Sequence, residues 1–93
     1  MKKNQFVKDL KEKDAVDAPF LIKVSSTALG KNGKPYMNLV FMDQTGEVEG
    51  RIWEDVAVYA GQAVRDSFVH VTGKCQAYQG RRQIVVQSLQ ILR

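Results

Sequence analysis

Two short segments with the same alternating pattern face each other across a tight turn, and this feature constrains the fold most. In residues 36–43 (YMNLVFMD) and again in residues 47–53 (EVEGRIW), one set of alternate positions suits a buried face. The segments are separated by Gln44-Thr45-Gly46, a turn sequence. Alternate side chains of a strand share a face, so the mirrored pattern predicts an antiparallel hairpin. Its inward positions are Met37, Leu39, Phe41, Val48, Gly50 and Ile52.

Three further segments have the composition of strands. Residues 20–27 (FLIKVSST) are rich in β-branched and aromatic residues, and the turn signal Asn32-Gly33 follows them. Residues 68–78 contain Gly73, which predicts a bulge or a sharp bend. After a turn at Gln79-Gly80-Arg81, residues 83–92 form the last predicted strand. The first dozen or so residues are polar, and Val7, Leu10 and Val16 are their candidate anchors for a helical turn or a short strand.

Residues 54–64 change period and predict one short helix, because Val56, Tyr59, Ala60 and Ala63 recur at helical spacing. The order is then β-β-β-α-β-β. Five strands with a helix between the third and fourth are typical of the OB-fold, an all-β, partly open Greek-key barrel. Which parity of the first strand faces inward is left open. The predicted inward stripe is Ile22, Val24, Met37, Leu39, Phe41, Val48, Ile52, Val69, Val71, Ile84 and Val86.

Composition excludes several classes of protein. The 93 residues suit one small domain, with a lead-in segment at 1–17 and the barrel at 18–93. A single cysteine excludes an internal disulfide framework and an all-cysteine zinc site, and a single histidine removes most metal sites and His-based catalytic sites. We expect no cofactor, no metal and no catalytic residue. Cys75 is expected in the core, and His70 is expected to be either a surface or a half-buried residue. No membrane span or secretory signal is present, so the predicted location is the cytoplasm.

The net charge of +4 is unevenly distributed. Residues 1–17 hold five lysines and four acids, which nearly cancel, whereas residues 65–93 hold five basic residues and one acid. Such an uneven distribution of charge favours a polyanionic partner. It does not establish one, since a surface that only contacts water can have the same charges.

The outward face of the predicted hairpin carries side chains that the core does not need. Aromatic rings can stack on bases, and arginine can stack or pair with phosphate. OB-folds use this face, flanked by the loops after strands one and four, as a binding surface. Each of these side chains also has a purely structural interpretation. The predicted helix would cover Trp53, Tyr36 would simply begin a strand, and Arg81 and Arg82 would be ordinary solvated residues of a hairpin. The candidate nucleic-acid-binding residues are Lys31, Asn32, Lys34, Tyr36, Asn38, Arg51, Trp53, Tyr78, Arg81, Arg82 and Gln83.

One stretch of the sequence resembles a known family. It runs from Lys31-Asn32-Gly33-Lys34-Pro35-Tyr36 through Asp43-Gln44-Thr45-Gly46-Glu47-Val48-Glu49 to Trp53. It is similar to the N-terminal OB-fold of bacterial 3′-5′ exoribonucleases of the YhaM type, in which an HD-type metal-dependent phosphohydrolase domain follows. The residues Ala63-Val64-Arg65-Asp66-Ser67 depart from the Gly-Asp turn that usually precedes strand four there. The resemblance implies an N-terminal module of a longer protein, with an HD-type domain as a possible partner.

Two functions are weighed from the sequence, and a third, a free-standing enzyme, is disfavoured because no catalytic group of residues is found. The first is a non-catalytic module that binds single-stranded RNA or DNA, RNA being favoured by the resemblance, and holds it for a nuclease domain. The alternative is a protein-interaction or oligomerisation module that uses the outward Tyr36, Val40, Met42 and Trp53 as an apolar contact.

Overall fold

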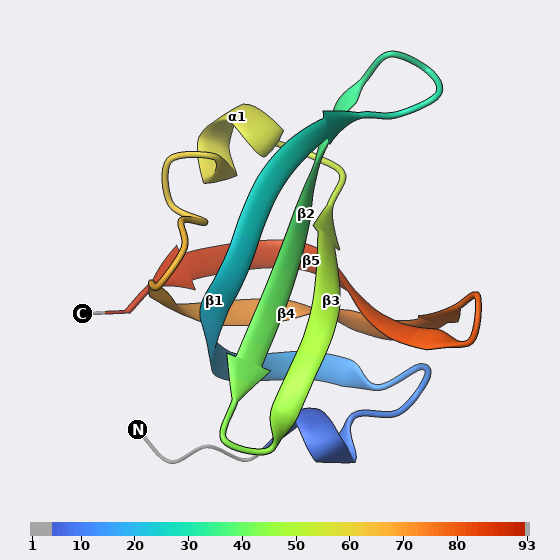
Figure 1. The fold of residues 1–93 in the computed structure, drawn as a ribbon, viewed down its shortest axis with the longest axis vertical. Coiled ribbons are helices and arrows are strands. Elements are labelled where there is room, and N and C mark those ends of the chain that lie inside the picture. Colours follow the sequence, from blue (N-terminus) through green and yellow to red (C-terminus); the bar gives the residue numbers. More distant parts are fainter. Residues whose placement is uncertain (1–4, 93) are drawn as a thin grey trace.

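The five strands close into a single barrel in a computed structural model that describes residues 5–92 (Figure 1). The strands are β1 (Ala15–Leu29), β2 (Pro35–Asp43), β3 (Gly46–Ile52), β4 (Phe68–Tyr78) and β5 (Arg81–Ile91). They are joined in the order β1-β2-β3-β5-β4, and β1 pairs with β4 to complete the barrel. A 3-10 turn, η1 (Val7–Asp9), and a short helix, α1 (Val56–Tyr59), are the helical elements of the described residues. The all-β prediction with this element order is confirmed. None of the described helices has the length and apolar character needed to span a membrane.

Strand β1 is longer than predicted and forms part of both halves of the barrel. It begins at Ala15, and its first half pairs with β4 while its second half pairs with β2. The expected boundary at residue 18 therefore lies inside β1. A bulge between Ile22 and Val24 shifts the register, so that Ser25 and not Val24 follows Ile22 toward the interior. Val24 is 44% exposed, and its predicted place in the core is wrong for this reason.

The β2–β3 hairpin has the predicted register. Leu39 pairs with Gly50, and Phe41 pairs with Val48. Gly50 lies against the ring of Phe41, and this close approach requires a glycine. A Cβ atom at position 50 would be only 2.3 Å from Phe41 Cε2. At the turn, the Asp43 carboxylate accepts hydrogen bonds from the backbone N–H and the hydroxyl of Thr45.

Helix α1 is much shorter than the predicted range of 54–64. Only Val56–Tyr59 is α-helical, and Asp55 before it has a left-handed backbone (φ 56°). Val56 and Ala63 are nonetheless buried, as the helical spacing predicted. The segment crosses from β3 to β4 at the barrel end that also carries the β1–β2 loop (Figure 1).

The last two strands form the predicted hairpin. Tyr78 pairs with Arg81, and the two turn residues between them, Gln79 and Gly80, both have positive φ. The predicted irregularity at Gly73 is confirmed as a register shift between Thr72 and Gly73. Parallel pairing of β5 with β3 then closes the barrel.

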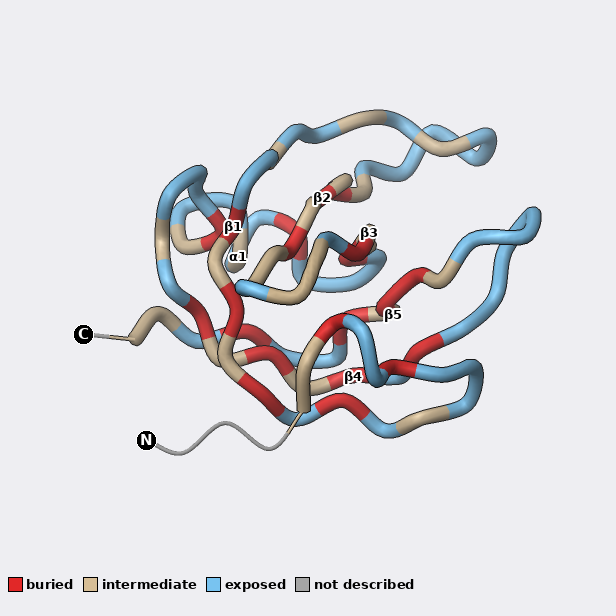
Figure 2. Tube along the Cα trace, turned by 60° about the horizontal axis from the view of Figure 1, so that its bottom comes forward, coloured by how far each residue is buried: buried red, intermediate tan, exposed pale blue. Residues whose placement is uncertain are grey.

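Buried and exposed residues alternate along the strands, and the buried ones line the interior of the barrel (Figure 2). Val7 and Leu10 join this core, 1% and 3% exposed, so the segment around η1 covers the barrel end opposite α1 (Figure 1). Arg82 fixes that segment, because its Nη1 donates hydrogen bonds to the carbonyls of Val7 (2.6 Å) and Leu10 (2.9 Å). The core thus includes residues from both ends of the sequence.

Candidate nucleic-acid interface

Two aromatic side chains at the α1 end of the barrel are already stacked on each other. The rings of Tyr36, at the start of β2, and Trp53, just after β3, have centroids 4.8 Å apart and an interplanar angle of 27°. Trp53 remains 52% exposed, so α1 does not cover it. The stack positions the indole, and its uncovered surface can receive a further flat ring.

A hollow of about 470 Å³ surrounds this aromatic pair. Tyr78, at the end of β4, also lines it and is 60% exposed. The hollow contains residues from the three segments that the sequence analysis expected to form one surface: the loop after β1, the β2–β3 face and the β4–β5 hairpin. Its lining residues are Leu29, Gly30, Lys31, Asn32, Tyr36, Trp53 and Tyr78.

The loop after β1 contributes cations on a fixed backbone. Asn32 Oδ1 accepts a hydrogen bond from the Lys34 N–H at 3.0 Å, and Gly33 has the positive φ of 78° that this turn requires. Lys31 and Lys34 are exposed, and no carboxylate of residues 5–92 forms an ion pair with either. These two ammonium groups are therefore available to an anionic ligand.

Asn38 and Arg51 lie side by side on the outer surface of β2 and β3. They are register partners, and both are half-buried. The Arg51 guanidinium donates to the Gly50 carbonyl at 3.0 Å, and its Nη2 lies 3.6 Å from Glu49 Oε2. The structure thus places Arg51 on the predicted face, with its charge partly neutralised by Glu49.

The remaining predicted residues are not gathered around the aromatic pair. Arg81 is exposed and pairs with Glu49 Oε1 at 3.3 Å. Arg82 uses its Nη1 on the carbonyls of Val7 and Leu10, as described above. Gln83 is 8% exposed, so its side chain is part of the barrel wall. Sequence reasoning did not foresee the contacts of Arg82, because they join residues more than 70 positions apart.

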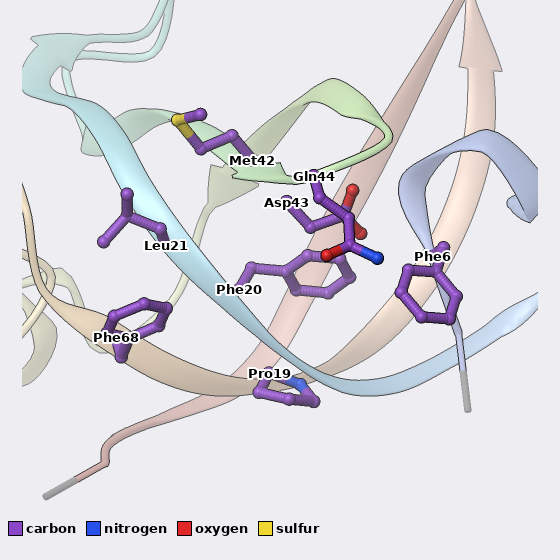
Figure 3. A pocket seen from close by; sticks show the side chains of 8 residues that line it. All are labelled: Phe6, Pro19, Phe20, Leu21, Met42, Asp43, Gln44 and Phe68. Carbon is purple, nitrogen blue, oxygen red and sulfur yellow. The ribbon is translucent and has the colours of Figure 1, made fainter. Parts of the chain in front are cut away.

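A second, apolar groove of about 400 Å³ lies away from the aromatic pair and was missed from the sequence (Figure 3). Phe68, 61% exposed, is its most accessible aromatic side chain. The signal for it was present in the apolar residues at outward positions of β1 and β2, such as Leu21 and Met42. The other lining residues are Phe6, Pro19, Phe20, Asp43 and Gln44.

The histidine and the cysteine occupy the expected kinds of position. His70 is half-buried, and its Nε2 contacts the carboxylate of Asp17. Cys75 is fully buried, and this burial raises the pKa of its thiol, an effect that the nearby Arg82 charge opposes. Within residues 5–92 no three His, Cys, Asp or Glu side chains are grouped so that they could hold a metal ion.

A family model described as an OB-fold nucleic acid binding domain matches residues 22–92. The chain belongs to this OB-fold family. Among curated proteins, this OB-fold domain is similar to the 3′-5′ exoribonuclease YhaM of Halalkalibacterium halodurans, with 36% identity over 80 residues, which are 82% of this chain and 24% of that protein. It is 35% identical over 85 residues to the enzyme of the same name from Listeria monocytogenes, covering 87% of this chain and 26% of that protein. The chain thus spans about a quarter of these relatives, and the resemblance seen in the sequence is confirmed.

Solved structures agree on the fold. The second OB-fold domain of replication protein A from Methanococcus maripaludis matches with a TM-score of 0.75 at 17% identity, covering 97% of this chain and 95% of that one. Asparaginyl-tRNA synthetase from Pyrococcus horikoshii matches with a TM-score of 0.77 at 20% identity, covering 100% of this chain and 24% of that one. At these identities the likeness shows the OB-fold itself.

Proposed function

We propose that this OB-fold domain binds single-stranded nucleic acid, RNA in preference to DNA, without itself being catalytic. The observation that carries the proposal is the Tyr36–Trp53 stack, whose indole is 52% exposed in a hollow that Lys31 also lines. The indole offers a ring for a base, and the Lys31 ammonium group, which no carboxylate of residues 5–92 pairs with, offers a charge for the adjoining phosphate.

Stacking supplies the larger part of the binding free energy in this proposal. A base on an aromatic ring contributes roughly 1–3 kcal/mol, without regard to sequence because every base has a π-face. Tyr36 holds Trp53 in place before the ligand arrives, so little conformational entropy of the indole is lost on binding. Lys31 and Lys34 then pair with phosphates, and this electrostatic part weakens as salt rises.

The preference for RNA and the substrate-holding role rest on the relatives. The curated relatives are named 3′-5′ exoribonucleases, and this domain corresponds to about a quarter of their length. We propose that a longer protein uses the domain to hold an RNA strand for a nuclease domain of the HD type. A cytoplasmic location, where such substrates occur, is part of the same proposal and agrees with a single cysteine that is buried as a free thiol.

A binding titration tests the proposal. Labelled oligouridylate, oligo-dT and duplex RNA are titrated with the protein at about 50 and 200 mM salt, and fluorescence anisotropy gives the Kd. We expect single strands to bind more tightly than the duplex, oligouridylate more tightly than oligo-dT, and affinity to fall with salt. Absence of binding to every single strand at the lower salt concentration would refute the proposal.

A pair of matched variants locates the binding surface. Trp53→Ala is expected to weaken binding by about 5- to 150-fold, since one stacking contact of roughly 1–3 kcal/mol is lost. Phe68→Ala removes another exposed aromatic side chain, in the apolar groove, and is expected to leave the Kd unchanged. Equal effects of the two variants would show that the stacked pair is not the binding surface.

The protein-interaction alternative stays a prediction, and light scattering of the protein alone tests its oligomeric form.

A further inference from the structure

One carboxylate on the outer surface of β3 lies between two arginines of the proposed binding surface. Glu49 Oε1 is 3.3 Å from Arg81 Nη1, and Glu49 Oε2 is 3.6 Å from Arg51 Nη2. Arg51 belongs to β3 itself, whereas Arg81 comes from the β4–β5 hairpin, so a single side chain links two elements. Each oxygen of the carboxylate faces a different guanidinium.

This arrangement is that of an anion held by two cations. Guanidinium groups bind carboxylates and phosphates through the same planar fork of N–H donors. A phosphodiester presents two terminal oxygens, as a carboxylate does. The side chain of Arg81 is 77% exposed and that of Arg51 is 21% exposed, so Arg81 is the arginine that solvent reaches freely. The Glu49 side chain is 34% exposed, which leaves the carboxylate room to move away.

A hollow beside the carboxylate offers room for a phosphate. It has a volume of about 320 Å³ and lies between β3 and the β4–β5 hairpin. Its lining includes a second acid, Glu47, but that carboxylate is paired with Lys23 Nζ at 2.5 Å. Its lining residues are Glu47, Val48, Glu49, Gly80, Arg81 and Arg82.

We propose that Arg51 and Arg81 form a backbone-phosphate site that Glu49 occupies in the unbound protein. The inference rests on the proposed function and adds its regulation: a phosphate of the bound strand must displace the Glu49 carboxylate. Glu49 therefore lowers affinity for single strands and reduces the number of cations that respond to salt. In the free domain Lys31 and Lys34 carry the electrostatic attraction, and the two arginines contribute only after Glu49 leaves.

The test is Glu49→Gln, which removes the charge and keeps the shape. Affinity for labelled oligouridylate of about 12 nucleotides, within the 4–16 that an OB-fold covers, is measured by anisotropy across a salt series. Each additional phosphate contact steepens the slope of log K against log salt by about 0.7 for single strands. Counted from 1 M salt, where this electrostatic gain is zero, one added contact raises affinity about eightfold at about 50 mM salt and about threefold at about 200 mM.

Glu47→Gln is the matched control, because it makes the same charge change on the same strand and in the same hollow, at a carboxylate paired with Lys23. We expect it to change affinity much less than Glu49→Gln. A second measurement is Arg81→Ala, which should weaken binding more in the Glu49→Gln background than in the wild type. That non-additivity identifies Arg81 as the cation that Glu49 holds.

The outcomes separate this inference from the proposed function. Equal gains from Glu49→Gln and Glu47→Gln would show a general charge effect and overturn the inference. A loss of affinity in Glu49→Gln would also overturn it, by showing that the carboxylate orients the arginines for the ligand. In both cases the wild type still binds and the proposed function stands. If neither the wild type nor Glu49→Gln binds any single strand, both fail.

Discussion

Arg82 provides the sharpest test of how the structure assigns the basic residues. The sequence analysis placed this guanidinium among the phosphate contacts, whereas the structure uses it to hold the segment around η1. Replacing it by methionine keeps the aliphatic stem and removes both hydrogen bonds to the carbonyls of Val7 and Leu10. The change therefore isolates the guanidinium.

The magnitude follows from those two bonds. A hydrogen bond from a charged donor contributes about 1.5–3 kcal/mol net, and the partly buried carbonyls would regain some water when it is lost. We therefore expect Arg82→Met to lower the free energy of unfolding by about 2–4 kcal/mol. For a domain of this size, roughly 4–8 °C per kcal/mol converts this into a fall in Tm of at least about 8 °C.

Arg81→Met is the matched control, since it makes the same charge change one residue away on the same hairpin. Its guanidinium is 77% exposed and pairs with Glu49, an interaction worth less than about 1 kcal/mol. Urea denaturation followed by Trp53 fluorescence compares the two variants. Equal stability of the two would refute the structural role of Arg82. A loss of RNA affinity in folded Arg82→Met would support the sequence-based prediction instead.

Three further predictions concern the barrel itself. Gly50→Ala should lower the unfolding free energy by about 1–3 kcal/mol, because the new methyl group meets the Phe41 ring, and Phe41→Leu should partly restore it; thermal melts of the single and double variants test this. Gly73→Ala should lower the unfolding free energy more than Gly50→Ala does, since its Cβ would lie 2.2 Å from the backbone oxygen of Val85. Because backbone is in the way, shortening a neighbouring side chain should not rescue it. Equal stability of the two variants in the same melts would contradict this. The Cys75 thiol should react with a disulfide reagent only on unfolding, because the side chain is fully buried and out of reach of the reagent; the burial also raises its pKa. The native state then keeps the proton that the unfolded state loses, so stability should fall as pH rises past the ordinary thiol pKa, and denaturation of Cys75→Ala should lack that contribution.

The sequence predicted the barrel well wherever the alternation of apolar and polar residues along a strand alone decides which side chains are buried. Leu39 and Val71, for example, are buried as their positions in the pattern required. Val24 was misplaced because a bulge reverses the parity of all positions after it, and no residue near Lys23 signals a bulge as Gly73 does. The helix was overextended because periodic burial of Val56 and Ala63 also arises from a short helix followed by turns.

The candidate site was predictable as a surface but not as a set of contacts. The sequence identified the outward Tyr36 and Trp53 because strand parity places side chains on faces. It could not show that Glu49 lies between Arg51 and Arg81, because that arrangement depends on where the β4–β5 hairpin lies in space. The same limit applies to Arg82, whose partners are set by the packing of the first residues against the last hairpin.

The contact between Val7 and Arg82 also has a consequence for how the chain folds. It joins residues 75 positions apart, and the parallel β3–β5 pairing likewise waits for the last strand. Chains that depend on such distant contacts fold slowly, on the scale of milliseconds to seconds, because loop-closure entropy is lost before the contacts form. During synthesis, the β1–β2–β3 sheet would therefore expose its apolar inner face until β5 has left the ribosome. This interval is when the domain is most open to aggregation.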